Sequence, residues 1–163
     1  KTLILGLGNP IICDDSVGFK VIEMLQRELT DREDLTITAT SLSGLNLLDM
    51  TAGYEKVIIV DSIQTEGGRP GDIYKLAPSD FEMARHSASI HDVGLVSALE
   101  LGRKLGLDRP RQVVLFAIEA EDVTSFSEEC TPQVEKAIPV AARMVMAEVA
   151  AGDSLRKGAV DRE

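Results

Sequence analysis

Short apolar runs alternate along the chain with segments of helical periodicity. Three of these runs are continuous and rich in Val, Ile and Leu, as expected of buried strands: Thr2–Leu7, Lys56–Asp61 and Gln112–Ile118. Leu35–Thr40 alternates and is rich in β-branched residues, which is typical of another strand. Asp72–Leu76 follows a turn region with three glycines and a proline. We predict that it forms a short strand, antiparallel and near an edge of the sheet.

The segments between the strands have the apolar spacing of amphipathic helices. We expect the helix that begins at His91 to end at Gly106. Pro139 lies inside the helix that begins at Pro132, where it predicts a kink or a late start. Residues 77–90 have no clear period. The predicted helices are Asp14–Leu29, Gly44–Met50, a segment that begins at His91 and a segment that begins at Pro132.

The alternation of strands and helices predicts the fold class. It indicates a single α/β domain, a three-layer α/β/α sandwich around a mostly parallel, twisted sheet. A chain of 163 residues has the length of one domain. We assign this domain to residues 1–151 and expect residues 152–163 to form a polar, frayed tail. No apolar run approaches the ~20 residues that a membrane-spanning helix needs.

Charge and cysteine content narrow the function classes. The 27 acidic and 17 basic residues give a formal net charge of −10, which would repel the phosphates of a nucleic acid. Cys13 and Cys130 are too few for a disulfide framework and lack the spacing of a metal knuckle. We therefore expect a cytoplasmic protein with no nucleic-acid partner and no membrane insertion.

The first strand ends in a glycine-rich turn, Gly6–Pro10, of the kind that binds the phosphates of a nucleotide in some α/β proteins. A dinucleotide-binding turn would carry a third glycine where Ile11 stands. The acidic pair Asp14 and Asp15 would also repel a pyrophosphate at the start of the following helix. The turn is therefore not expected to bind a nucleotide.

Acidic residues and one histidine fall where a parallel sheet would gather them. Asp14 and Asp15 follow the first strand, Asp61 ends the third, and His91 opens a helix. Strand ends and helix starts line one crevice in a doubly wound sheet, and two carboxylates with an imidazole are a suitable ligand set for nickel or zinc. Helix capping by the aspartates, turn amides bound by Asp61 and a capping or core histidine would explain the same residues. The residues alone leave both interpretations open.

Four further side chains near the crevice have simpler explanations. Glu119, Glu121 and Asp122 follow the last strand and can face the same crevice or form a solvated acidic loop. Cys13 has no basic neighbour in sequence that would lower the pKa of its thiol, so we expect it to pack as a small hydrophobic residue.

With these positions assembled, the chain resembles the hydrogenase maturation proteases, which process the large subunit of NiFe hydrogenases. The resemblance extends from Leu3 to about Val149. It is carried by the turn Gly6-Leu7-Gly8-Asn9 with Asp14, Asp15 and Gly18, by Ile58–Ser62, by Ser89–Leu95, and by Thr131-Pro132 with the helix that follows.

The resemblance implies an endopeptidase of phosphorylase/hydrolase-like fold that removes a C-terminal extension from a nickel-loaded large-subunit precursor. Asp15, Asp61 and His91 correspond to the metal-contacting trio of the family, in which Asp14 would be a helix cap. The Ni²⁺ would arrive with the substrate, and Cd²⁺ or Zn²⁺ could replace it in crystals. Nickel could polarise the scissile carbonyl, or it could only dock the substrate while a carboxylate acts as general base. We expect a monomer or a weak oligomer.

The chain departs from the family pattern at three positions. Ser16 stands where many members carry glycine, and Thr40 and Ser41 replace the acid and a glycine of an Asp-Gly-Gly segment. Serine at position 16 is small enough to be tolerated, whereas the residues at positions 40 and 41 bear on whether the site has a fourth carboxylate and on which hydrogenase is recognised.

Two rival functions share part of the pattern. Peptidyl-tRNA hydrolase also ends its first strand in Gly-Leu-Gly-Asn-Pro, but it needs a catalytic histidine soon after the turn, and Ile11–Gly18 contains none. A non-catalytic nickel-binding chaperone could use the same three ligands. It remains the alternative from a different functional class.

Overall fold

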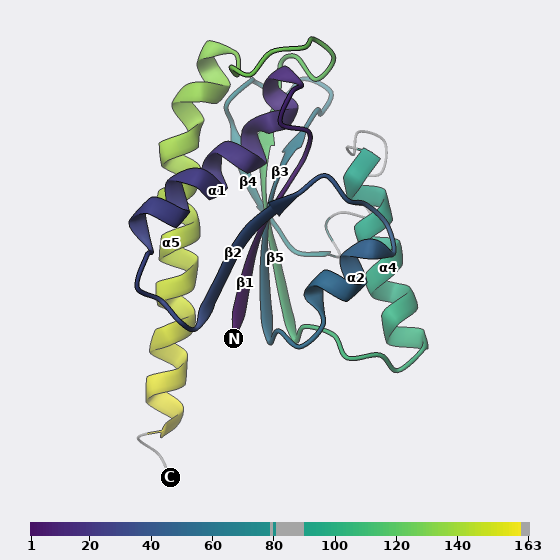
Figure 1. The fold of residues 1–163 in the computed structure, drawn as a ribbon, viewed down its shortest axis with the longest axis vertical. Coiled ribbons are helices and arrows are strands. Elements are labelled where there is room, and N and C mark those ends of the chain that lie inside the picture. Colours follow the sequence, from purple (N-terminus) through teal and green to yellow (C-terminus); the bar gives the residue numbers. More distant parts are fainter. Residues whose placement is uncertain (79, 81–89, 161–163) are drawn as a thin grey trace.

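The structure is a computed structural model that describes the backbone of residues 1–78, 80 and 90–160, and the side chains of residues 1–78, 80 and 97–152. Within these residues, five strands form one sheet flanked by helices on both faces (Figure 1). The strands are β1 (Thr2–Leu7), β2 (Leu35–Thr40), β3 (Lys56–Ile63), β4 (Ile73–Leu76) and β5 (Gln112–Glu119). The helices are the 3-10 turn η1 (Cys13–Ser16), α1 (Val17–Glu28), α2 (Asn46–Thr51), α4 (Ile90–Lys104) and α5 (Pro132–Val160).

The strand order is β2-β1-β3-β5-β4, and only β4 runs antiparallel to its neighbour. The predictions of a mostly parallel sheet and of a short antiparallel edge strand are therefore confirmed. From β1 the chain first builds outward to β2 and then returns to place β3 on the other side of β1. This reversal makes the β1–β3 boundary a topological switch point, where open α/β sheets bind ligands beyond the strand ends.

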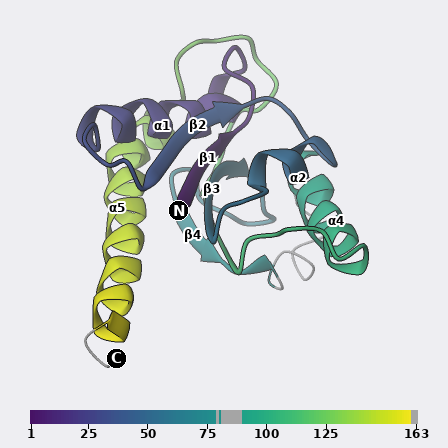
Figure 2. The same cartoon turned by 60° about the horizontal axis from the view of Figure 1, so that its bottom comes forward.

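Two helical layers cover the sheet, which confirms the predicted three-layer sandwich. Helices α1 and α5 lie on one face, and α2 and α4 lie on the other (Figures 1 and 2). Alternate residues of β3 serve the two faces: Ile58 and Val60 pack in the core beneath α1 and α5, whereas Val57 and Ile59 pack in the other core. All of β3 is buried, as its continuous apolar run predicts.

Helix α1 buries one apolar stripe, Val17, Val21 and Leu25, against the sheet. Each fully buried side chain of this size stabilises the fold by roughly 1.5–3 kcal/mol relative to an exposed one. The stripe repeats every four residues, so one face of the helix is apolar from its first turn to its last. This packing holds the start of α1, and the acidic pair before it, close to the end of β1.

Several element boundaries differ from the predicted ones. The first helix begins as the 3-10 turn η1 and becomes α-helical only at Val17. Strand β3 continues two residues past Asp61 because Ser62 and Ile63 still pair with β5, so Asp61 lies inside the strand instead of ending it. Helix α5 begins at Pro132, as predicted, and runs through Pro139, so, of the kink or late start predicted at Pro139, the late start is excluded.

The remaining predictions concern the ends of α4 and α5. Helix α4 begins at Ile90, next to the predicted start at His91, and most of the aperiodic stretch 77–90 lies outside the described residues. Helix α5 continues to Val160, past the predicted start of the tail at residue 152. Among the described helices, none is long and apolar enough to cross a membrane.

Candidate functional site

The turn after β1 is shaped by a close approach between Gly8 and Asp15. Gly8 has φ 140°, and a Cβ at this position would lie 2.0 Å from the carbonyl oxygen of Asp15. The same carbonyl accepts a hydrogen bond from the backbone N–H of Asn9 at 3.1 Å. Only glycine allows the chain to fold back this tightly, so Gly8 serves to place the acidic pair at the end of β1.

Asp14 is completely buried and binds three segments of the chain together. Its Oδ2 accepts the backbone N–H groups of Glu121 and Asp122 at 2.9 and 3.0 Å. Its Oδ1 accepts the backbone N–H of Thr131 at 2.7 Å, and the Thr131 hydroxyl donates to the same carboxylate. The carboxylate therefore ties η1 to the loop after β5 and to the residue before α5.

These contacts correct the expected role of Asp14. No side chain caps η1 or α1, so Asp14 does not cap the helix that follows it in sequence. It lies instead at the start of α5, where a negative charge interacts favourably with the helix dipole. Its partners are 107 to 117 residues away in sequence, which is why local pattern could not reveal them.

Asp15 and Asp61 meet through Ser62. The Ser62 hydroxyl donates to Asp15 Oδ1 at 2.9 Å, and the Ser62 backbone N–H donates to Asp61 Oδ1 at 2.8 Å. Asp15 is partly exposed, whereas Asp61 is 0% exposed and Ser62 is 1% exposed. The structure therefore brings two of the three predicted site residues to the β1–β3 switch point. The sequence reasoning missed Ser62, whose only signal was its place directly after Asp61.

The two carboxylates approach this point from opposite sides of the sheet. By the alternation of β3, Asp61 belongs to the face of Ile59 and Ile63, which is covered by α2 and α4. Asp15 precedes α1, on the other face. His91 is the second residue of α4, and its side chain lies outside the described residues. Its placement in the helix that covers the Asp61 face is compatible with the predicted trio, which stays a prediction.

The described side chains contain no group of three or more His, Cys, Asp or Glu residues that could hold a metal ion. Asp15 and Asp61 alone therefore provide two oxygen ligands, of the hard type that accepts a divalent cation. A further ligand can come from His91, whose side chain lies outside the described residues, or from a bound substrate.

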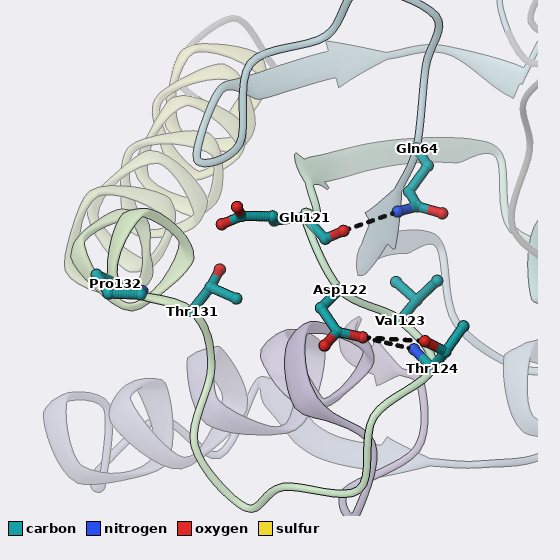
Figure 3. A pocket seen from close by; sticks show the side chains of 7 residues that line it. All are labelled: Gln64, Glu121, Asp122, Val123, Thr124, Thr131 and Pro132. Atoms are coloured by element: carbon teal, nitrogen blue, oxygen red, sulfur yellow. Dashed lines mark hydrogen bonds between the residues drawn. The ribbon is translucent and has the colours of Figure 1, made fainter.

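A pocket of about 590 Å³ opens beside the site, at the carboxyl ends of β3 and β5 (Figure 3). The Glu121 side chain extends from the loop after β5 toward the start of α5 (Figure 3). Hydrogen bonds from Ser125 and Thr124 lower the pKa of Asp122 to about 2, so this wall of the pocket is anionic at neutral pH. The lining residues are Gln64, Glu121, Asp122, Val123, Thr124, Thr131 and Pro132.

Glu119 differs from the acidic residues that follow it. It is 2% exposed, and its carboxylate accepts the backbone N–H and the hydroxyl of Thr65 at 2.7 and 2.9 Å. It therefore anchors the turn after β3 rather than belonging to a solvated acidic loop, and the solvated interpretation is wrong for this residue. Glu121, by contrast, is exposed as that interpretation predicts.

Both cysteines are free thiols in the described part of the chain. Cys13 is buried, and this burial raises the pKa of its thiol, which confirms its prediction as a small packed residue. Burial likewise raises the pKa of Cys130 to about 11. Neither thiol is therefore activated as a nucleophile at neutral pH.

Comparisons with known proteins agree with one another. The hydrogenase maturation protease family model matches residues 19–148. The hydrogenase 2 maturation protease of Escherichia coli is 26% identical over 148 residues, which are 90% of this chain and 89% of that protein. The hydrogenase expression/formation protein HupD of Thiocapsa roseopersicina is 23% identical over 90% of this chain, which spans 66% of its length. The solved structure of the hydrogenase maturating endopeptidase HybD from E. coli superimposes with a TM-score of 0.77 at 27% identity and covers 93% of both chains.

Proposed function

Because this chain belongs to the hydrogenase maturation protease family, we propose that it is an endopeptidase that removes the C-terminal extension of a nickel-loaded NiFe hydrogenase large-subunit precursor. The family membership predicted from the motifs is confirmed by the family match and by the structural similarity to HybD. The substrate and the role of nickel are our proposals. The free thiols of both cysteines fit the cytoplasm, which we propose as the site of action.

One observation supports this function above the others. Asp15 in η1 and Asp61 in β3 both accept a hydrogen bond from Ser62 at the switch point of the sheet. Carboxylates with an imidazole suit nickel, and His91 on α4 would supply the imidazole. Nickel is part of the substrate in this proposal, so the precursor brings the remaining ligands and the enzyme needs no metal of its own.

The two carboxylates differ in access, which assigns them different parts in the reaction. Asp15 is partly exposed, so it meets the substrate first. Asp61 is completely buried next to Ser62 and supports the site from within the sheet. In one route, Asp15 accepts a proton from the water that attacks the scissile carbonyl. In the other, the carboxylates only dock the nickel, and the nickel polarises the carbonyl.

The test uses three variants and the nickel-loaded precursor. We expect Asp15→Ala, Asp61→Ala and His91→Ala each to abolish release of the C-terminal peptide, measured by gel shift, while circular dichroism shows a folded protein. Asp31→Ala, which removes an exposed carboxylate between α1 and β2 and outside the site, is the matched control and should still process the precursor. Wild-type rates in all three site variants would refute the assignment.

The same assay separates the rival functions. A nickel-binding chaperone would bind the loaded precursor and leave it intact, so tight binding without peptide release would favour the chaperone. A peptidyl-tRNA hydrolase would need a histidine near the first turn, and residues 11–18 have none. Hydrolysis of the peptidyl-tRNA ester without precursor processing would favour that activity.

A further inference from the structure

Ser62 contacts both candidate carboxylates and has no assigned role. It lies in β3 and is 1% exposed. Its hydroxyl donates to Asp15 Oδ1 at 2.9 Å, and its backbone N–H donates to Asp61 Oδ1 at 2.8 Å. Ser62 and Asp15 are 47 positions apart in sequence, so the hydroxyl contact exists only in the folded chain.

The two contacts are held with different rigidity. The N–H that binds Asp61 belongs to the backbone of β3, which pairs with β5 at Asp61, Ser62 and Ile63. Asp15, in contrast, lies on a 3-10 turn of four residues, and the terminal torsion of an aspartate is broad. A hydrogen bond to a charged carboxylate is stronger and shorter than one between neutral groups. The Ser62 hydroxyl therefore fixes one oxygen of the Asp15 carboxylate to the rigid backbone of β3.

We propose that Ser62 is a positioning residue, which holds the Asp15 carboxylate in a fixed orientation relative to Asp61 for contact with substrate-borne nickel. The proposal rests on the proposed function, because it concerns the same two carboxylates. Side chains that are oriented before the substrate arrives lose less conformational entropy when it binds, so the complex is more stable. Without the hydroxyl, the Asp15 carboxylate loses this restraint on its orientation, and its contact with the nickel weakens.

The first experiment compares Ser62→Ala with Ser16→Ala. Ser16 is also 1% exposed, and its hydroxyl donates to the Cys13 carbonyl at 2.7 Å rather than to a site carboxylate. Binding to immobilised precursor, nickel-loaded or nickel-free, is measured by biolayer interferometry. Ser62→Ala should bind the loaded precursor roughly tenfold more weakly, the effect of one hydrogen bond to a charged group. Its affinity for nickel-free precursor should be unchanged, and Ser16→Ala should bind both forms as the wild type does.

A double-mutant cycle then shows whether Ser62 acts through Asp15. In an Asp15→Ala background, Ser62→Ala should cause no additional loss of affinity for the loaded precursor, because the carboxylate that Ser62 orients is already absent. Equal weakening of both precursor forms, or additive effects in the cycle, would overturn the positioning role and indicate a general structural one.

Failure of this inference can be told from failure of the proposed function. If the wild type processes loaded precursor and Ser62→Ala binds it equally well, only the role of Ser62 is refuted. If the wild type leaves the loaded precursor intact and does not prefer it over the nickel-free form, the proposed function fails, and the role of Ser62 fails with it.

Discussion

Asp14 offers the sharpest stability prediction, because its buried carboxylate accepts hydrogen bonds from three backbone N–H groups and one hydroxyl. Asp14→Ala removes both carboxylate oxygens and so leaves the backbone N–H groups of Glu121, Asp122 and Thr131 without this acceptor. An unsatisfied buried donor costs about 1–3 kcal/mol. Water can reach part of this loop and the carboxylate no longer has to be desolvated, so the lower end of the range applies to each donor.

We therefore expect Asp14→Ala to lower the free energy of unfolding by about 3 kcal/mol, a large part of the ~5–15 kcal/mol of a typical domain. Asp14→Asn keeps one oxygen acceptor and should cost less. The chain has no tryptophan, so urea unfolding is best followed by far-UV circular dichroism. Asp31→Ala removes the same charge from an exposed position and should change stability by less than about 0.5 kcal/mol.

Hydrogen exchange gives a second readout of the same contacts. The amides of Glu121, Asp122 and Thr131 should exchange faster in Asp14→Ala than in the wild type, since each loses its acceptor. If Asp14→Ala is no less stable than Asp31→Ala and these three amides stay protected, the reasoning about the buried carboxylate is wrong.

Two further predictions concern the stability of the fold. Burial raises the pKa of Glu148, but hydrogen bonds and charge from Lys56 and Lys75 outweigh it and leave the pKa below 4.5. The ionised Glu148 carboxylate therefore stabilises the fold above pH 4.5, and this contribution is lost as the pH falls through the folded-state pKa. Urea unfolding should show that Glu148→Gln is less stable than the wild type at pH 7 and that the difference shrinks below pH 4.5. A difference that stayed constant with pH would contradict this reasoning. Gly18→Ala would place a Cβ 2.3 Å from the backbone carbonyl oxygen of Leu7, the last residue of β1. We expect this substitution to lower the free energy of unfolding by about 1–3 kcal/mol and therefore to lower the melting temperature. An unchanged melting temperature would contradict this close approach.

The strands and most helices could be predicted because their signals are local. A continuous apolar run such as Lys56–Asp61 specifies a buried strand wherever it pairs, and the spacing of Val17, Val21 and Leu25 specifies one face of a helix. The end of β3 could not be predicted in the same way, because Ser62 is polar and belongs to the strand only through its pairing with β5.

The candidate site was predictable in its members but not in its connections. Asp15 and Asp61 were identified because they follow or end strands that a parallel sheet places side by side. The bond from the Ser62 hydroxyl to Asp15 and the bonds from the later loop to Asp14 join residues 47 to 117 positions apart, and no local pattern encodes them. Glu119 was misjudged for the same reason, since its partner Thr65 lies 54 positions earlier.

The central claim is tested most directly by intact-mass spectrometry of the large-subunit precursor after incubation with the wild-type protein. Two samples are compared, one loaded with nickel and one nickel-free, at equal enzyme concentration. We predict that the loaded precursor loses a single C-terminal peptide and that the nickel-free precursor keeps its full mass. Full mass in both samples, or equal cleavage of both, would contradict a protease that recognises its substrate through nickel.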